Sequence, residues 1–162
     1  MQSPEQTARH YENFPVAWFI PRSMKRPILA LYAFARTADD LADEGGESVE
    51  RLKNLDDWSR RLKEASAGRA TSSLFEELSK LFRDTAVTPD LLEDLLVAFR
   101  QDVVKNRYQT FEELREYCRY SANPIGRAVL MLFGYSEKAL LELSDKICTA
   151  IQLVNHWQDI AV

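Results

Sequence analysis

The stretch that decides the fold is YAFARTADDLADE, residues 32–44. Its apolar residues recur every three or four positions, which is the spacing of an amphipathic α-helix. Asp39 and Asp43 are four residues apart, so on a helix their carboxylates lie about 40° apart around the axis, one turn above the other. Arg36 comes nearly one turn before Asp39 and shares this face. The stretch therefore predicts a helix with two acids and a base on one side.

Two readings of this acidic face stay open at this point. The acids crowd the carboxyl-terminal end of the predicted helix, where the helix dipole disfavours negative charge, so we expect a compensating group. Mg²⁺ is one such group, because it takes oxygen ligands from one or two carboxylates together with substrate phosphates. The other reading is an acidic helix end that is simply exposed to water.

Helical spacing continues through nearly the whole chain, and no stretch alternates apolar and polar residues as a β-strand does. Capping residues and glycine stops predict the helix boundaries. The expected helices cover residues 3–12, 27–44, 49–65, 73–85, 89–105, a sixth from Thr110 kinked at Asn123-Pro124, and a last one capped by Ser136 and running to the end. We therefore expect an all-α protein.

Composition sets the broad class of the protein. The 162 residues are 46% hydrophobic and 28% charged, with a net charge of −4, which fits one globular domain and excludes a disordered chain. Acidic and basic residues are mixed, which argues against a nucleic-acid partner. Cys118 and Cys148 form no metal or redox motif and favour a reducing, cytoplasmic setting. Peripheral membrane contact and the oligomeric state are left open.

Two further helices carry polar residues at helical spacing. The last helix places Gln152, Asn155 and Asp159 on a segment otherwise rich in apolar residues. Buried polar groups need partners, so either a ligand or an interhelical hydrogen bond would account for them. Tyr117 and Tyr120 lie on adjacent parts of one face of the sixth helix. They could be catalytic residues, but two tyrosines on a helix are more often half-buried parts of the core.

Four motifs in order resemble one known family. They are HYENFP (10–15), YAFARTADDLADE (32–44), YCRYSANPIG (117–126) and QLVNHWQDIAV (152–162). Together they resemble the squalene/phytoene synthase family, and most of all its bacterial hydroxysqualene synthase branch. The resemblance implies an isoprenoid synthase-type helical bundle around a central cavity. Residues 1–162 would then form the N-terminal part of a single domain whose C-terminal part is absent, with a final motif aspartate expected at position 163.

The resemblance implies a role for each matching residue. Asp39 and Asp43 would hold Mg²⁺ against a diphosphate, and Asn155 and Asp159 would begin a second metal-binding motif on a facing helix. Tyr117 would lie near the reacting carbons. The remaining residues expected to contact substrate are His10, Arg36, Tyr120, Gln152 and Asn155, and Asp102 would match a further acidic position.

The activity that the resemblance implies is conversion of presqualene diphosphate to hydroxysqualene by diphosphate ionisation and capture of water. One alternative is head-to-head condensation of prenyl diphosphates such as farnesyl diphosphate. Another is a non-catalytic family member that serves as an assembly factor. This shortened chain could also lack activity on its own.

Overall fold

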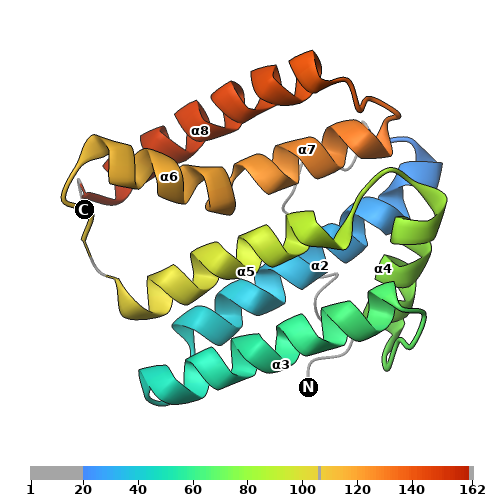
Figure 1. The fold of residues 1–162 in the computed structure, drawn as a ribbon, viewed down its shortest axis with the longest axis horizontal. Coiled ribbons are helices and arrows are strands. Elements are labelled where there is room, and N and C mark those ends of the chain that lie inside the picture. The colour runs from blue at the N-terminus through green and yellow to red at the C-terminus, as the bar shows by residue number, and fades with distance from the viewer. Residues whose placement is uncertain (1–19, 106, 161–162) are drawn as a thin grey trace.

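The computed structural model describes residues 20–105 and 107–160, with side chains up to residue 158. These residues form seven α-helices and no strand (Figure 1). The helices are α2 (Arg22–Asp43), α3 (Ser48–Ser66), α4 (Ser73–Asp84), α5 (Pro89–Val104), α6 (Phe111–Ser121), α7 (Asn123–Leu132) and α8 (Lys138–Ile160). The helix expected over residues 3–12 lies outside the described residues. The all-α prediction is confirmed.

Helix α5 is the centre of the bundle. It packs against α2 and α3 on one side and against α6 and α7 on the other. Helix α8 lies on α6 and α7 and runs antiparallel to them, while the short α4 closes the end of the molecule where α2 begins (Figure 1). The carboxyl ends of α2, α5 and α8 point toward the same end of the molecule. This arrangement brings together segments that are far apart in the sequence.

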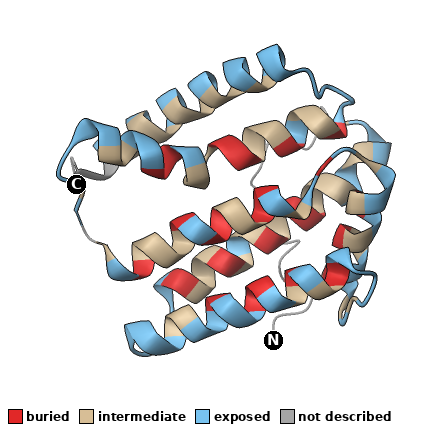
Figure 2. Cartoon of the chain, in the orientation of Figure 1, coloured by how far each residue is buried: buried red, intermediate tan, exposed pale blue. Residues whose placement is uncertain are grey.

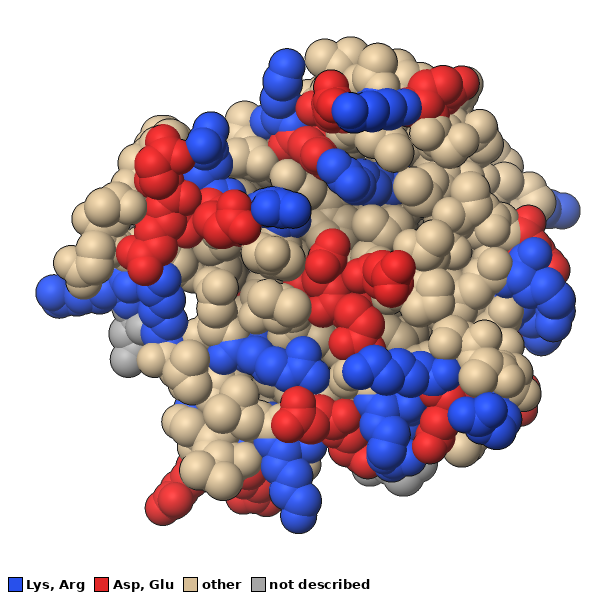
Figure 3. All heavy atoms as spheres, in the orientation of Figure 1, with Lys and Arg blue, Asp and Glu red and all other residues tan. Residues whose placement is uncertain are grey.

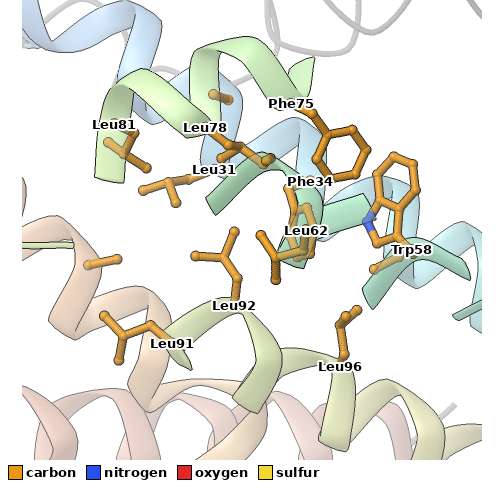
Figure 4. Close-up of a cluster of buried hydrophobic side chains, with 14 of the residues drawn as sticks. Leu31, Phe34, Trp58, Leu62, Phe75, Leu78, Leu81, Leu91, Leu92 and Leu96 are labelled. Atoms are coloured by element: carbon orange, nitrogen blue, oxygen red, sulfur yellow. The ribbon is translucent and has the colours of Figure 1, made fainter. Parts of the chain in front are cut away.

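The main core lies between α2, α3, α4 and α5. Phe34, Trp58 and Phe75 meet there, with ring centroids 5.7 Å apart for Phe34–Trp58 and 4.8 Å for Trp58–Phe75. Leucines from all four helices surround these rings (Figure 4). Figure 2 shows the buried residues on the facing sides of the helices, as the periodic apolar spacing predicts.

Helix α2 begins earlier than predicted. We expected Pro27 at its first turn, but the helix starts at Arg22, with Pro21 as the residue before it, and contains Pro27. Met24, in the turn before Pro27, and Ile28, directly after it, are partly buried against the core, so the helix gains apolar burial on both sides of the proline. That burial offsets the hydrogen bond that proline cannot donate.

The Asn123-Pro124 break is stronger than the predicted kink. Helix α6 ends at Ser121 and α7 begins at Asn123, because Ala122 between them has φ −120° and ψ −45°. Proline lacks the backbone donor that a continuous helix needs there, so the chain restarts with Pro124 in the first turn of α7. Gly126 then lets α8 approach α7 closely, since a Cβ atom there would lie 2.5 Å from Ser144 Oγ.

The predicted caps have mixed outcomes. Thr110 caps α6 as expected, and its hydroxyl accepts a hydrogen bond from the Glu113 amide at 3.2 Å. The prediction that Ser136 caps the last helix was wrong. Helix α8 begins at Lys138, and the carbonyl of Glu137 accepts the first helical bonds. The cap is therefore one residue later than the side-chain pattern indicated.

No helix in the described part of the chain is both long and apolar enough to cross a membrane. On the face of the molecule in Figure 3, charges of both signs are interspersed, and several acidic side chains lie directly beside basic ones. Ion pairs within helices account for part of this pattern, as for Arg60 with Glu64 at 2.7 Å.

Candidate active site

Two arginine side chains contact the acidic carboxyl end of α2. Arg36 lies 3.0 Å from a carboxylate oxygen of Asp39 and 2.7 Å from one of Asp40. Arg51 from α3 donates a hydrogen bond at 2.6 Å to the carbonyl of Ala42, in the last turn of α2. Two arginines thus supply part of the positive charge that the carboxyl end of this helix requires.

The pKa of Asp39 is raised despite its ion pair with Arg36. Burial raises the pKa of the Asp39 carboxyl, the negative charge of Asp43 raises it further, and only Arg36 among its main neighbours lowers it. Asp43 itself is exposed. The two acids therefore repel each other as the helical spacing predicted, and a bound cation would relieve that repulsion.

A third carboxylate faces this pair from the central helix. Asp102, in the last turns of α5, has its pKa raised to about 6, first by burial and then by the charges of Asp43 and Asp39. Tyr117 on α6 donates a hydrogen bond to Asp102 at 2.9 Å, which favours the charged carboxylate. The structure therefore brings together acids of α2 and α5 with the buried tyrosine of α6.

Tyr117 lies in a small aromatic group that also contains Tyr108 and His156. The ring centroids are 5.2 Å apart for Tyr108–Tyr117, 5.6 Å for Tyr108–His156 and 6.0 Å for Tyr117–His156. Lys105 lies 4.6 Å above the Tyr108 ring. Burial, and then the charge of Asp102, raise the pKa of both tyrosines. Both phenols therefore stay protonated near neutral pH and can donate hydrogen bonds.

The donor set fits a magnesium ion in part. Asp39, Asp43 and Asp102 offer hard oxygen ligands, and the charge of Asp43 raises the pKa of both Asp39 and Asp102, which is an arrangement that a dication stabilises. Within residues 20–105 and 107–158, however, no group of three or more histidine, cysteine, aspartate or glutamate side chains is placed to hold a metal by itself. Oxygen atoms of a bound diphosphate would have to complete the coordination shell.

The other predicted residues differ in burial, and two of them cannot be placed in the structure. Gln152 is half-buried and Asn155 is exposed on α8, while Tyr120 is half-buried beside the small cluster of Ala98, Tyr117 and Cys118. The Asp159 side chain and His10 lie outside the described residues. Neither the second metal motif nor the substrate contacts are tested by these positions, and they stay predictions.

A polar cavity of about 560 Å³ lies between α5, α6, α7 and α8. Its lining includes Asp94, Arg119 and Arg127, and Arg127 forms a two-pronged ion pair with Asp145 at 2.8 and 2.6 Å. None of the residues predicted from the sequence to bind substrate or metal lines this cavity. We therefore place the candidate site at the Asp39–Asp102–Tyr117 end.

Comparison with known proteins shows the family of the chain. The sequence model of the family described as squalene/phytoene synthase matches residues 7–162. The chain belongs to the squalene/phytoene synthase family. Among curated relatives, it is 42% identical over 156 residues to a hydroxysqualene synthase of Zymomonas mobilis, covering 91% of this chain and 50% of the relative. It is 41% identical over 159 residues to that of Sinorhizobium fredii, covering 96% and 53%.

Solved structures of this family agree with the fold. The crystal structure of squalene synthase HpnC from Alicyclobacillus acidocaldarius matches with a TM-score of 0.88 at 41% identity, covering 97% of this chain and 61% of that one. A dehydrosqualene synthase structure matches with a TM-score of 0.77 at 24% identity and supports the fold alone. The expected isoprenoid synthase fold is confirmed. The chain spans about half the length of the curated relatives it matches.

Tyr108 and His156 were not singled out from the sequence of this squalene/phytoene synthase family member. Tyr108 follows α5 outside any helix, and His156 sits between the expected ligands Asn155 and Asp159. No spacing rule relates either residue to Tyr117.

Proposed function

We propose that this chain carries the diphosphate-binding part of a hydroxysqualene synthase-like enzyme, which converts presqualene diphosphate to hydroxysqualene. The observation that carries the proposal is the hydrogen bond from Tyr117 to Asp102 beside Asp39 and Asp43. The identity of about 41% to hydroxysqualene synthases supports this reaction over the others of the family.

Asp39 and Asp43 are the residues that would hold Mg²⁺, and the charges of both raise the pKa of Asp102. A bound dication supplies neutralisation of the charge on the leaving diphosphate. Arg36, now shared between Asp39 and Asp40, is a cation beside the acids that could move to the diphosphate. Release of Arg36 to the substrate is favourable only when another cation takes its place beside Asp39.

Tyr117 acts on the carbon skeleton in this proposal. Its hydroxyl is fixed on Asp102, so the ring is held in one orientation. A carbocation over an aromatic face is stabilised by roughly 0.5–2 kcal/mol. Tyr108 and His156 pack against the ring and exclude stray water from one side of it.

Substrate choice tests the proposal directly. The 162-residue chain is incubated with Mg²⁺ and no NADPH, once with presqualene diphosphate and once with farnesyl diphosphate, beside the Zymomonas mobilis enzyme as positive control. We expect hydroxysqualene from presqualene diphosphate only. Turnover of farnesyl diphosphate alone would instead favour head-to-head condensation.

A non-catalytic assembly role predicts different binding behaviour. If the chain binds metal and diphosphate, pyrophosphate with Mg²⁺ should raise its melting temperature more than either does alone, since ligand binding stabilises the folded state. No Mg²⁺-dependent shift, together with no turnover under conditions where the control enzyme is active, would favour the assembly role.

A further inference from the structure

Arg51 connects the start of α3 to the carboxyl end of α2. These two helix ends lie at the same end of the molecule and are joined by a short loop over residues 44–47 (Figure 1). Nη1 of Arg51 donates a hydrogen bond at 2.6 Å to the carbonyl oxygen of Ala42, and Nη2 donates one at 3.3 Å to the hydroxyl of Ser48. One guanidinium therefore bridges two helices across their connecting loop.

The carbonyl of Ala42 is one that the helix cannot satisfy by itself. The last four carbonyls of an α-helix have no amide donor in a following turn. Helix α2 ends at Asp43, and the amide of Glu44 donates a hydrogen bond at 2.8 Å to the carbonyl of Asp40 before the chain becomes extended. The last turn of α2 contains no basic residue. Arg51 thus supplies from α3 both the donor and the positive charge that this helix end lacks.

The two arginines at this helix end have different partners. Arg36 pairs with the carboxylates of Asp39 and Asp40, so a metal ion bound to Asp39 would compete with it. Both hydrogen bonds of Arg51 go to neutral oxygen atoms instead. Arg51 can therefore keep its position when a cation binds to the carboxylates.

The contacts of Arg51 depend on the shape of a guanidinium. Its planar fork reaches two acceptors in one fixed geometry, which a single ammonium group does not reproduce. The Nε atom is buried and has no hydrogen-bond partner within the described part of the chain. A buried donor without an acceptor lowers stability, so the bonds to Ala42 and Ser48 are kept although Nε is left unsatisfied.

We propose that Arg51 is a positioning residue for the metal site on α2, an inference that rests on the proposed function. Ala42 directly precedes Asp43, so fixing the Ala42 carbonyl fixes the turn that carries the Asp43 carboxylate. Mg²⁺ requires near-ideal octahedral geometry, and a frayed last turn would take Asp43 out of register with Asp39. Arg51 acts through the backbone of α2 and touches neither metal nor substrate.

The variant Arg51→Met tests the proposal, because methionine keeps an apolar stem and removes the guanidinium. We expect faster hydrogen exchange at the amides of Asp43 and Glu44, measured by NMR without ligand. We also expect a rise of about tenfold in the Mg²⁺ concentration that half-saturates pyrophosphate binding, measured by calorimetry on the 162-residue chain. Arg60→Met is the matched control, since both carboxylate partners of Arg60 lie on α3, and it should change neither quantity.

The two measurements separate the possible outcomes. Unchanged exchange in Arg51→Met would overturn the proposal, because the guanidinium would then not hold the last turn of α2. Faster exchange with an unchanged Mg²⁺ requirement would also overturn it, since Arg51 would then serve folding alone. A parent chain that binds no pyrophosphate in the presence of Mg²⁺ would refute the proposed function and with it the metal role of Arg51, whereas the exchange result would still show whether Arg51 fixes the turn.

Discussion

Tyr117 on α6 donates a hydrogen bond at 2.9 Å to the carboxylate of Asp102 on α5. The pair connects the aromatic group around Tyr117 with the acids at the end of α2, because the charges of Asp39 and Asp43 raise the pKa of Asp102. The hydrogen bond lowers the pKa of Asp102 while burial and the two acids raise it. The balance between these effects is open to measurement.

Removing the hydroxyl should shift the titration of Asp102. In Tyr117→Phe, the carboxylate loses a donor, so its pKa should rise above the value of about 6. Carbon NMR of aspartate-labelled protein, without divalent metal, measures this pKa. Tyr135→Phe, an exposed tyrosine, is the control. A pKa that stays constant or falls in Tyr117→Phe would contradict the hydrogen bond.

Asp102 should also make stability depend on pH. Its pKa is raised in the folded state from 3.8 to about 6, so protonation favours folding at low pH, and this contribution is lost as the pH rises through about 6. The shift corresponds to roughly 3 kcal/mol, which partial solvent exposure reduces to about 1–2 kcal/mol. We therefore expect Asp102→Asn to be more stable than the parent by that amount near pH 8.

Urea unfolding followed by circular dichroism at several pH values measures the effect. The advantage of Asp102→Asn should shrink as the pH falls toward 4, where the parent carboxyl is protonated. Asp56→Asn, whose side chain is 71% exposed, should show no such pH dependence. An advantage of the same size at pH 4 and pH 8 would rule out titration of Asp102 as its cause.

Asp39 and Asp43 should be needed for catalysis and dispensable for folding. Replacing either with Asn removes a charged oxygen ligand but keeps the side-chain shape, so turnover should be abolished while the circular dichroism spectrum is unchanged. Asp84→Asn, an exposed aspartate at the end of α4, is the control. Near-normal turnover in Asp39→Asn or Asp43→Asn would refute the metal assignment.

The Arg127–Asp145 pair should stabilise the packing of α7 on α8. It is bidentate and partly buried, so Asp145→Ala should lower the free energy of unfolding by about 1–2 kcal/mol. Glu142→Ala removes a looser contact, 3.7 Å from Lys138, and should cost less than about 0.5 kcal/mol. Chemical denaturation measures the free energy of unfolding of both variants. Equal losses would contradict a stabilising role for the Arg127–Asp145 ion pair.

The aromatic core should be sensitive to truncation. Phe34 has 0% exposure and contacts Trp58 and Phe75, so Phe34→Ala should destabilise the fold by about 3–5 kcal/mol through the cavity it leaves. Phe111→Ala, at an exposed position, should change stability by no more than about 0.5 kcal/mol. Thermal or urea unfolding distinguishes these expectations, and a small effect at Phe34 would show that the core collapses to fill the space.

The residue order alone predicts the helices, the all-α class and the family of this chain. Helical periodicity is a local property, because each apolar position is related to its neighbours by the geometry of one helix. The errors arose where tertiary contacts overrode local signals. Pro27 lies inside α2, where Met24 in the preceding turn packs against the core, and Glu137 rather than Ser136 precedes the first turn of α8.

Only the tertiary structure decided which faces meet. Asp102 and Tyr117 belong to different helices, and no spacing rule pairs them, because their contact depends on how α5 and α6 pack. The apolar residues of α8 can be read from the sequence, yet which of them its neighbours cover cannot. A helix with apolar residues on two faces buries whichever face its neighbours cover, and α6 and α7 cover the face that bears His156.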